Sequence, residues 1–148
     1  MTARREGAAI LFVNPRGEVL LRLRSDRPGL LFANQWDTIG GAVELGESHE
    51  EAAVRETREE IGLELQGHIY WDEYQSLVLV RIYAAPLDVP SEEIELTEGQ
   101  RVEWFDLEAA MKLPLHPWVA AILPEFMQSD AFSQAKVAAA TGSGVKKP

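Results

Sequence analysis

The stretch that decides the fold is GGAVELGESHEEAAVRETREEIGL, residues 40–63, which holds seven glutamates and two arginines. Its net charge of −5 (seven minus two) is half of the chain's formal −10. Ser48 and Glu51 have the S-x-x-E spacing of a capping box, which predicts a helix that starts at Ser48. Gly62 suits the left-handed cap at the other end. Between these signals lie about thirteen residues, close to the average helix length.

One face of the predicted helix gathers three carboxylates. Glu56, Glu59 and Glu60 are neighbours because residues three and four apart lie on the same side of a helix. Ala52 and Ala53, one turn earlier, leave this face without bulk and without countercharge. A solvated helix is the ordinary interpretation, but the like charges at positions 56 and 60 repel each other. A hard divalent cation, Mg²⁺ or Mn²⁺, is the simplest partner for such oxygen ligands.

The other sides of the helix have structural roles. One side can pack on a sheet and consists of Val54, Thr57 and Ile61. The third side consists of Glu51, Arg55 and Arg58, which we expect to pair among themselves.

The loop before the helix completes the pattern. Gly40 and Gly41 let the backbone turn sharply and approach closely, which exposes a peptide carbonyl as one more oxygen ligand. Glu47, just outside the helix, can pair with Arg55 and hold the loop against the helix. A Gly-Gly pair alone would indicate no more than an ordinary turn.

The whole chain has the composition of a soluble folded domain. It has 148 residues, of which 46% are hydrophobic and 26% charged, enough for one domain with a proper core. The absence of cysteine excludes disulfides, thiolate metal sites and a cysteine nucleophile, and fits a reducing, cytoplasmic location. No apolar run approaches the roughly 18 residues of a membrane span. The net charge of −10 argues against non-specific binding to a nucleic-acid polymer.

The segments around the helix are read mainly as strands. Alternating and β-branched patterns predict strands, and turn residues mark their ends. The predicted strands are residues 7–14, 18–24, 65–75, 76–86 and 101–106, and the predicted terminal helices are residues 106–113 and 116–128. The segment 129–148 is small, polar and rich in glycine near its end, so we expect a mobile tail after a single domain over residues 1–128.

These residues resemble the Nudix box, G-x5-E-x7-R-E-U-x-E-E-x-G-U, where U is a bulky aliphatic residue. The matching positions are Gly41, Glu47, Arg55, Glu56, Glu59, Glu60, Gly62 and Leu63. Thr57 stands where the pattern prefers an aliphatic residue, and Ile39 stands where many members have proline. The order of strands and helices also resembles the Nudix fold. The chain is therefore identified as a member of the Nudix hydrolase superfamily, in the α/β (α+β) class, with an α/β/α sandwich, a mixed central sheet and a catalytic helix.

The resemblance implies a Mg²⁺- or Mn²⁺-dependent hydrolase of nucleoside diphosphate-linked substrates. The implied metal ligands are Glu56, Glu59, Glu60 and the carbonyl of Gly40, with Gly41, Glu47, Arg55 and Gly62 as structural support. The group that removes a proton from water stays open between Glu56 and Glu98, and Glu98 is preferred to Glu103 in the acidic loop that resembles a family site. Glu98 is also an expected metal ligand.

The substrate follows less directly from the sequence. The proline typical of ADP-ribose hydrolases and the tyrosine typical of dinucleoside polyphosphate hydrolases are missing at their usual distances, where this chain has Val78 to Arg81. A small MutT-like nucleoside triphosphate pyrophosphohydrolase, with oxidised nucleotides as one substrate class, is therefore preferred. A nucleotide-sugar or ADP-ribose pyrophosphatase and a non-catalytic nucleotide sensor are the alternatives. The absence of cysteine sets isopentenyl diphosphate isomerase aside.

Four residues are candidates for substrate binding, each with a structural alternative. Arg22 and Arg24 lie on one strand face and can meet phosphate or base. Asn34 has an amide suited to a base but also suits a turn. Trp36 can stack on a base, although an aromatic beside a strand is more often core. Three further tryptophans are interpreted as packing: Trp71, Trp104 and Trp118. We expect a small nucleotide as partner, no nucleic-acid polymer, no membrane, and a monomer or homodimer.

Overall fold

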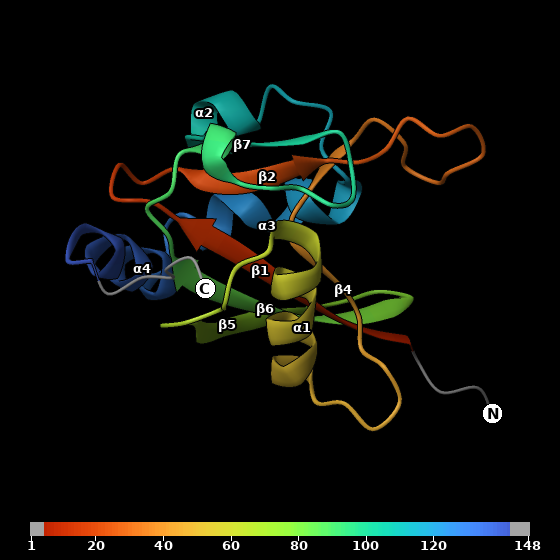
Figure 1. The fold of residues 1–148 in the computed structure, drawn as a ribbon, viewed down its shortest axis with the longest axis horizontal. Helices are drawn as coiled ribbons and strands as arrows, with labels where there is room; N and C mark the ends of the chain where they lie inside the picture. Colours follow the sequence, from red (N-terminus) through yellow and green to blue (C-terminus); the bar gives the residue numbers. More distant parts are fainter. Residues whose placement is uncertain (1–4, 143–148) are drawn as a thin grey trace.

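The computed structural model describes residues 5–142. Seven strands, four α-helices and a short 3₁₀ helix follow one another along this part of the chain (Figure 1). In chain order they are β1 Arg5–Val13, β2 Val19–Leu23, β3 Trp36–Asp37, β4 Ile39–Ala42, α1 His49–Ile61, β5 Ile69–Gln75, β6 Val78–Pro86, η1 Ser91–Glu93, β7 Arg101–Phe105, α2 Leu107–Ala110, α3 Pro117–Phe126 and α4 Asp130–Ala140.

The strands form one mixed sheet around β1. The main path runs β3-β2-β1-β6-β5, while β4 pairs with β1 and β7 pairs with β2. β1 is parallel to β6 along its whole length, from Arg5 opposite Val78 to Val13 opposite Pro86. Its other edge is shared, because β4 pairs antiparallel with its first half and β2 meets its last residue. β1 is therefore covered on both edges and forms the centre of the sheet.

Helices cover both faces of the sheet, and two hydrophobic cores result. Ala8, Ile10 and Phe12 of β1 lie in the core that α1 covers. Leu11 and Val13, which alternate with them, lie in the opposite core beneath α3 and α4. Figure 1 shows α1 in front of the sheet and α3 and α4 behind it. The predicted α/β/α sandwich with a mixed sheet is confirmed.

The local signals at both ends of α1 are confirmed. The Ser48 side chain accepts a hydrogen bond from the Glu51 N–H, and the Glu51 side chain accepts one from the Ser48 N–H, so both halves of the capping box are present. Gly62 ends the helix in the left-handed conformation, with φ 68°. Thr57 is fully buried and donates its hydroxyl to the Ala53 carbonyl, so it keeps the packing role of the aliphatic residue.

The expectation of a tail from residue 129 is corrected by the structure. α4 begins at a Ser129 cap, whose side chain accepts from the Phe132 N–H, and continues to Ala140. Ala131, Ala135 and Ala139 are buried, because small side chains at this spacing let the helix lie close to the sheet. Residues 143–148, the rest of the expected tail, lie outside the described residues.

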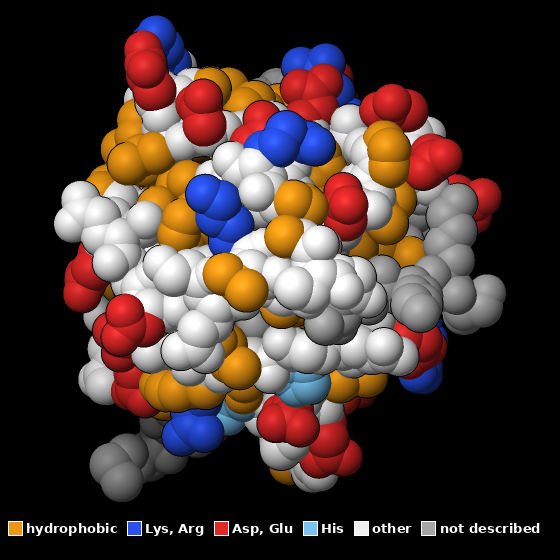
Figure 2. Space-filling model, turned by 90° about the vertical axis from the view of Figure 1, so that its left-hand side faces the viewer, with side chains coloured by type: hydrophobic (Ala, Val, Ile, Leu, Met, Phe, Trp, Pro, Cys, Tyr) orange, Lys and Arg blue, Asp and Glu red, His pale blue; other side chains and the backbone are white. Residues whose placement is uncertain are grey.

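The surface agrees with the composition. On the face drawn in Figure 2, acidic, basic and hydrophobic side chains of the described residues are interspersed, without a continuous basic patch. In residues 5–142, no helix combines the length and apolar character needed to cross a membrane.

Candidate active site and metal centre

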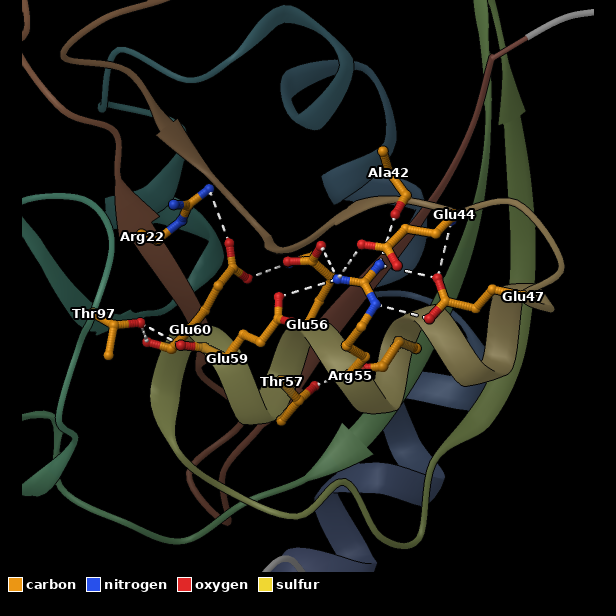
Figure 3. A network of polar contacts seen from close by, with 12 residues as sticks. Arg22, Ala42, Glu44, Glu47, Arg55, Glu56, Thr57, Glu59, Glu60 and Thr97 are labelled. Carbon is orange, nitrogen blue, oxygen red and sulfur yellow. Dashed lines mark hydrogen bonds and ion pairs between the residues drawn. The ribbon is translucent and has the colours of Figure 1, made fainter.

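Arg55 on α1 joins the helix to the loop that follows β4. Its Nε and Nη2 donate to the two carboxylate oxygens of Glu47 at 2.8 and 3.0 Å, and Nη2 also donates to the Ala42 carbonyl at 2.9 Å. Its Nη1 donates to Glu56 at 2.9 Å and to Glu59 at 3.1 Å. Figure 3 shows the guanidinium in the middle of these groups, here called the Arg55 cluster. The predicted Glu47–Arg55 pair is confirmed.

Arg22 approaches the third glutamate from the opposite side. Its Nη2 lies 3.4 Å from Glu60 Oε1, and the two side chains are only 8% and 4% exposed. The other Glu60 oxygen accepts from the Gly40 N–H at 2.9 Å. Glu60 is therefore held by β2 and by β4 at the same time.

The expectation that the three glutamates lack countercharge is corrected. Arg55 reaches two of them from their own helix, and Arg22 reaches Glu60 from a strand 38 residues earlier. The expected pairing of Glu51, Arg55 and Arg58 among themselves is also wrong, because Arg55 turns to the loop. Arg58 instead donates to Glu64 at 2.6 and 2.7 Å.

Burial and hydrogen bonding shift the pKa values of these carboxyl groups in different directions. Burial raises the pKa of Glu60 to about 7, although Arg22 and the Gly40 N–H act in the opposite direction. Burial also raises the pKa of Glu56, against the hydrogen bond from Arg55. The charge of Glu98 adds to the rise of the pKa at both glutamates. By contrast, the hydrogen bond from Arg55 lowers the pKa of Glu47 to about 2.

Two glycines make room for this arrangement. A Cβ at Gly41 would lie 2.6 Å from the carboxylate carbon of Glu56, so Glu56 occupies the space that a side chain would fill. Gly40 has φ 147°, and a Cβ there would lie 2.2 Å from the Ala8 carbonyl oxygen. A side chain at Gly40 would force β4 away from β1, and a side chain at Gly41 would force Glu56 away from β4. Whether the Gly40 carbonyl binds metal stays a prediction.

Glu98 is brought to the site by a loop that is fastened to the end of α1. The hydroxyl of Thr97 donates to the Glu59 carbonyl, and the Thr97 N–H donates to the Glu60 carbonyl at 2.9 Å. Gly99 follows with φ 101°, and a Cβ there would lie 2.8 Å from the Leu23 carbonyl oxygen. Glu98 is exposed, and its carbonyl accepts from Arg22 Nη1 at 3.4 Å. The loop therefore sits between the helix that carries the glutamates and the strand that carries Arg22.

Two cavities open beside the glutamates. A cleft of about 290 Å³ extends over β1, β4 and β6 and is lined by Gly40, Gly41, Arg22 and Arg24, among others. A second cavity, of about 250 Å³, is lined by Arg22, Arg24, Arg27, Thr97 and Glu98, among others, and is called the basic cavity here. The structure thus brings Arg22 and Arg24 together on the wall between the two.

The other two substrate candidates have structural roles. Trp36 is 4% exposed, lies in the core beneath α3 and packs edge-on against Phe105, so the prediction that it stacks on a base is wrong for this fold. Asn34 has φ 60°, and its side-chain oxygen accepts from Gln100 Nε2 at 2.7 Å. This favours the turn alternative for Asn34.

Trp118 is the site residue that the sequence interpretation missed. The sequence predicts a packing role for this residue, but it lines the cleft, and its indole N–H donates to Asp37 Oδ1 at 3.1 Å. Asp37 lies 81 positions earlier in the chain. The H-P-W sequence at the start of α3 gives a capping signal but contains nothing that would indicate this distant partner.

The donor set fits a hard divalent cation in its chemistry. Buried or half-buried carboxylates whose charges raise one another's pKa are stabilised by a cation with oxygen ligands. Within residues 5–142, however, no three carboxylate or imidazole side chains are already gathered as metal ligands. Arg55 and Arg22 hold the glutamates instead, so binding of a metal would exchange arginine contacts for metal contacts.

Comparison with known proteins gives a consistent result. The family model described as NUDIX domain matches residues 3–126. The chain is 33% identical over 117 residues to the CTP pyrophosphohydrolase of Escherichia coli, covering 75% of this chain and 83% of that protein. It is 31% identical over 131 residues to the oxidized purine nucleoside triphosphate hydrolase of Danio rerio, covering 83% and 80%.

Two further matches extend the comparison. The chain is 36% identical over 114 residues to the NAD-capped RNA hydrolase NudC of Pseudomonas aeruginosa, but these cover 71% of this chain and only 38% of that longer protein. The solution structure of the E. coli ORF135 protein matches with a TM-score of 0.70 and 28% identity, over 84% of this chain and 89% of that one.

Proposed function

The chain belongs to the Nudix hydrolase superfamily as a pyrophosphohydrolase-family enzyme, and from this premise we propose that it is a MutT-like nucleoside triphosphate pyrophosphohydrolase. In the proposed reaction, water adds across a phosphoanhydride bond and releases a nucleoside monophosphate and pyrophosphate. The observation that carries the proposal is the position of the buried Glu60 and the half-buried Glu56 of α1. Their neighbours Arg22, Gly40 and Gly41 line cavities with space for several phosphates. The two relatives matched over most of their length bear the names of nucleoside triphosphate hydrolases.

Members of this family typically depend on a divalent metal ion. We propose Mg²⁺ or Mn²⁺, held by Glu56, Glu59, Glu60, Glu98 and the Gly40 carbonyl. When bound, the ion supplies neutralisation of the phosphate charge and lowers the pKa of bound water. The acidic chain carries −10 overall, so an anionic substrate needs this local neutralisation to approach the site.

The chain's own residues divide the remaining tasks. Arg24, together with the side of Arg22 that faces the cavities, binds phosphate oxygens by charge-assisted hydrogen bonds. The Nε atoms of both arginines are buried without a hydrogen-bond partner, so phosphate would meet these side chains at their Nη groups. Glu56 is the preferred acceptor of the water proton, because its raised pKa makes it a stronger base than an exposed glutamate. Glu98 is the second candidate.

Gly41, Glu47, Arg55 and Gly62 support the site without touching substrate. Arg55 ties Glu47 and the Ala42 carbonyl to α1, so the loop after β4 keeps its position. The proposed catalytic unit is a single domain that includes α4, because the buried alanines of α4 complete the core opposite α1.

The test is turnover of a defined substrate panel with Mg²⁺. We expect CTP, dGTP and 8-oxo-dGTP to give nucleoside monophosphate and pyrophosphate, measured by ³¹P NMR, with ADP-ribose, a nucleotide sugar and NAD as arms for the alternatives. Glu56→Gln should lower kcat by about 10²- to 10⁴-fold, since it removes a proton acceptor and an expected metal ligand. Glu50→Gln, an exposed change on the same helix, is the matched control.

Three results would count against the proposal. Cleavage confined to ADP-ribose, NAD or a nucleotide sugar would replace it with the diphosphate-linked alternative. Tight binding of nucleotides with no turnover would favour a sensor. Full turnover by Glu56→Gln and by Glu59→Gln would show that the glutamate assignment is wrong.

A further inference from the structure

The basic cavity is lined by three arginines, of which two already have an acidic partner. Nη2 of Arg22 lies 3.4 Å from Glu60 Oε1. Nη1 of Arg24 lies 3.6 Å from Asp37 Oδ2. Arg27 is exposed, and among the described residues its guanidinium has neither a hydrogen bond nor an ion pair. The charge of Arg27 is therefore free to meet a ligand in the cavity.

Arg27 has a defined position because it begins a tight turn. The Leu30 N–H donates to the Arg27 carbonyl at 3.1 Å. Between them stand Pro28 and Gly29, and Gly29 has φ 83°, which is the pattern of a type II turn. The Arg27 N–H donates to the Ser25 hydroxyl at 3.1 Å. The backbone that carries this arginine is thus held by hydrogen bonds on both sides.

A glutamine just before β7 joins the two ends of the loop that carries this turn. The loop, residues 25–34, leaves β2 and returns to β3, and Figure 1 shows it extending beyond the end of β2. Gln100 Nε2 donates to the Arg24 carbonyl at 2.8 Å and to Asn34 Oδ1 at 2.7 Å. The Asn34 N–H also donates to the Ser25 carbonyl at 3.2 Å. A compact loop with joined ends is an Ω-loop, and Gln100 fixes it against the acidic loop.

The size and the lining of the basic cavity suit a phosphate group. Its volume of about 250 Å³ is below the roughly 300–1,000 Å³ of sites that enclose a whole small molecule, so it holds only part of a ligand. Arginine binds phosphate oxygens through a planar fork of N–H donors. Glu98, an expected metal ligand, lines the same cavity as Arg27. A chain of phosphates that meets the glutamates at one end can therefore extend to Arg27 at the other.

We propose, resting on the proposed function, that Arg27 is a specificity-determining residue that selects nucleoside triphosphates over nucleoside diphosphates. Its guanidinium binds the terminal phosphate of a triphosphate, and a diphosphate is one group too short to reach it. Arg22 and Arg24 meet phosphates that both classes of nucleotide possess. The preference for triphosphates thus comes from one exposed side chain on a rigid loop, whereas hydrolysis takes place beside α1.

The first experiment measures binding without turnover. The full chain with Mg²⁺ is titrated by calorimetry with the α,β-methylene triphosphates and diphosphates of cytidine and deoxyguanosine, whose carbon bridge resists hydrolysis. Because each pair shares its base, recognition of the base cancels in the comparison. Arg27→Gln should weaken binding of the triphosphate by about 5- to 30-fold, through loss of a charge-assisted contact at an exposed position, and leave the diphosphate unchanged. An equal loss for both, no loss for either, or a wild type without preference would overturn the assignment.

Two further variants separate a direct contact from the overall charge. Arg16→Gln is the matched control, because Arg16 is an exposed arginine paired with Glu18 in the turn at the other end of β2. It makes the same change in net charge and should keep the preference for triphosphates. Arg27→Glu should weaken triphosphate binding more than Arg27→Gln, because it places a like charge beside the terminal phosphate. A loss in Arg16→Gln as large as in Arg27→Gln would overturn the proposal.

Steady-state kinetics provide an independent measure. For the triphosphate that the wild type hydrolyses fastest, Arg27→Gln should raise KM by the same 5- to 30-fold and change kcat by less than about twofold, because the contact is made equally in the ground state and the transition state. A fall in kcat with KM unchanged would overturn the assignment. A wild type that hydrolyses no triphosphate would refute the proposed function, but the binding comparison would still decide whether Arg27 distinguishes the terminal phosphate.

Discussion

Two arginines pair with the glutamates of α1 and of the loop before it, one in the interior of the protein and the other near its surface. Arg22 meets Glu60 in the interior, where both side chains are less than a tenth exposed. Arg55 meets Glu47 and Glu59 at the rim, where the glutamates are 14% and 58% exposed. The pKa of Glu60 is raised by burial to about 7, and the pKa of Glu47 is lowered to about 2 by its hydrogen bond with Arg55.

The difference shows that an ion pair does not by itself fix the charge of a carboxyl group. At Glu60 the loss of hydration outweighs the attraction of Arg22. At Glu47 the bidentate hydrogen bond from Arg55 outweighs the loss of hydration. With a pKa of about 7 the interior glutamate exchanges a proton near neutral pH, whereas the rim glutamate, with a pKa of about 2, stays charged beside Arg55.

The largest loss of stability is expected when the interior pair of Arg22 and Glu60 is broken. Arg22→Met keeps the aliphatic stem but leaves the buried Glu60 carboxylate uncompensated, so the free energy of unfolding should fall by about 3–5 kcal/mol at pH 8.5. Urea denaturation in the presence of EDTA measures it. The double variant Arg22→Met/Glu60→Gln removes both charges and should recover most of the loss. A double variant as unstable as the single one would show that packing of the arginine, not its charge, is the cause.

The next largest effect is expected in the pH dependence of the free energy of unfolding, which differs between the two environments. Because the folded-state pKa of Glu60 is raised from 4.5 to about 7, the folded protein binds more protons than the unfolded chain between these values. Without metal, the free energy of unfolding should therefore decrease as pH rises from 4.5 through 7, by about 3 kcal/mol from this group. Glu60→Gln should remove that decrease. The difference between wild type and variant isolates Glu60 from Glu47, whose lowered pKa acts in the opposite direction. Identical pH profiles would contradict the assignment.

The smallest effect compares two arginines at the rim. Arg55→Lys removes the planar fork that joins Glu47, Glu56 and Ala42, and should cost about 1 kcal/mol. Arg58→Lys disturbs two even shorter contacts with Glu64, but Arg58 is exposed and Glu64 is only half-buried, so no measurable change in stability is expected. Thermal unfolding of both variants at low salt measures the two losses of stability. Equal losses would mean that contact length, not the number of shared partners, sets the contribution.

Local signals predicted the helix and its caps because the groups involved lie within a few residues of one another. Ser48, Glu51 and Gly62 satisfy backbone groups of their own helix, and Glu47 lies only eight residues from Arg55. The contacts of Arg22 with Glu60 and of Asp37 with Trp118 could not be predicted in this way. Both depend on strand pairing and helix packing that bring distant segments together.

The same limit explains the two tryptophan assignments. Trp36 and Trp118 each stand beside an expected element, and nothing in their immediate sequence distinguishes a core ring from a cleft ring. β3 turns Trp36 into the core beneath α3, and the position of α3 leaves Trp118 at the cleft. α4 was missed for a related reason, because its alanines become hydrophobic contacts only against a sheet that the segment itself does not contain.

Thr97 couples the local opening of the acidic loop to the fraying of the end of α1. Its hydroxyl and its amide both donate hydrogen bonds to carbonyls at the end of α1, and Thr97 directly precedes Glu98. A fluctuation that lifts Glu98 away must first release the last turn of the helix, and fraying of that turn frees the loop. Amide hydrogen exchange in the two segments should therefore be cooperative, so the carboxylates are presented or withdrawn as one opening unit.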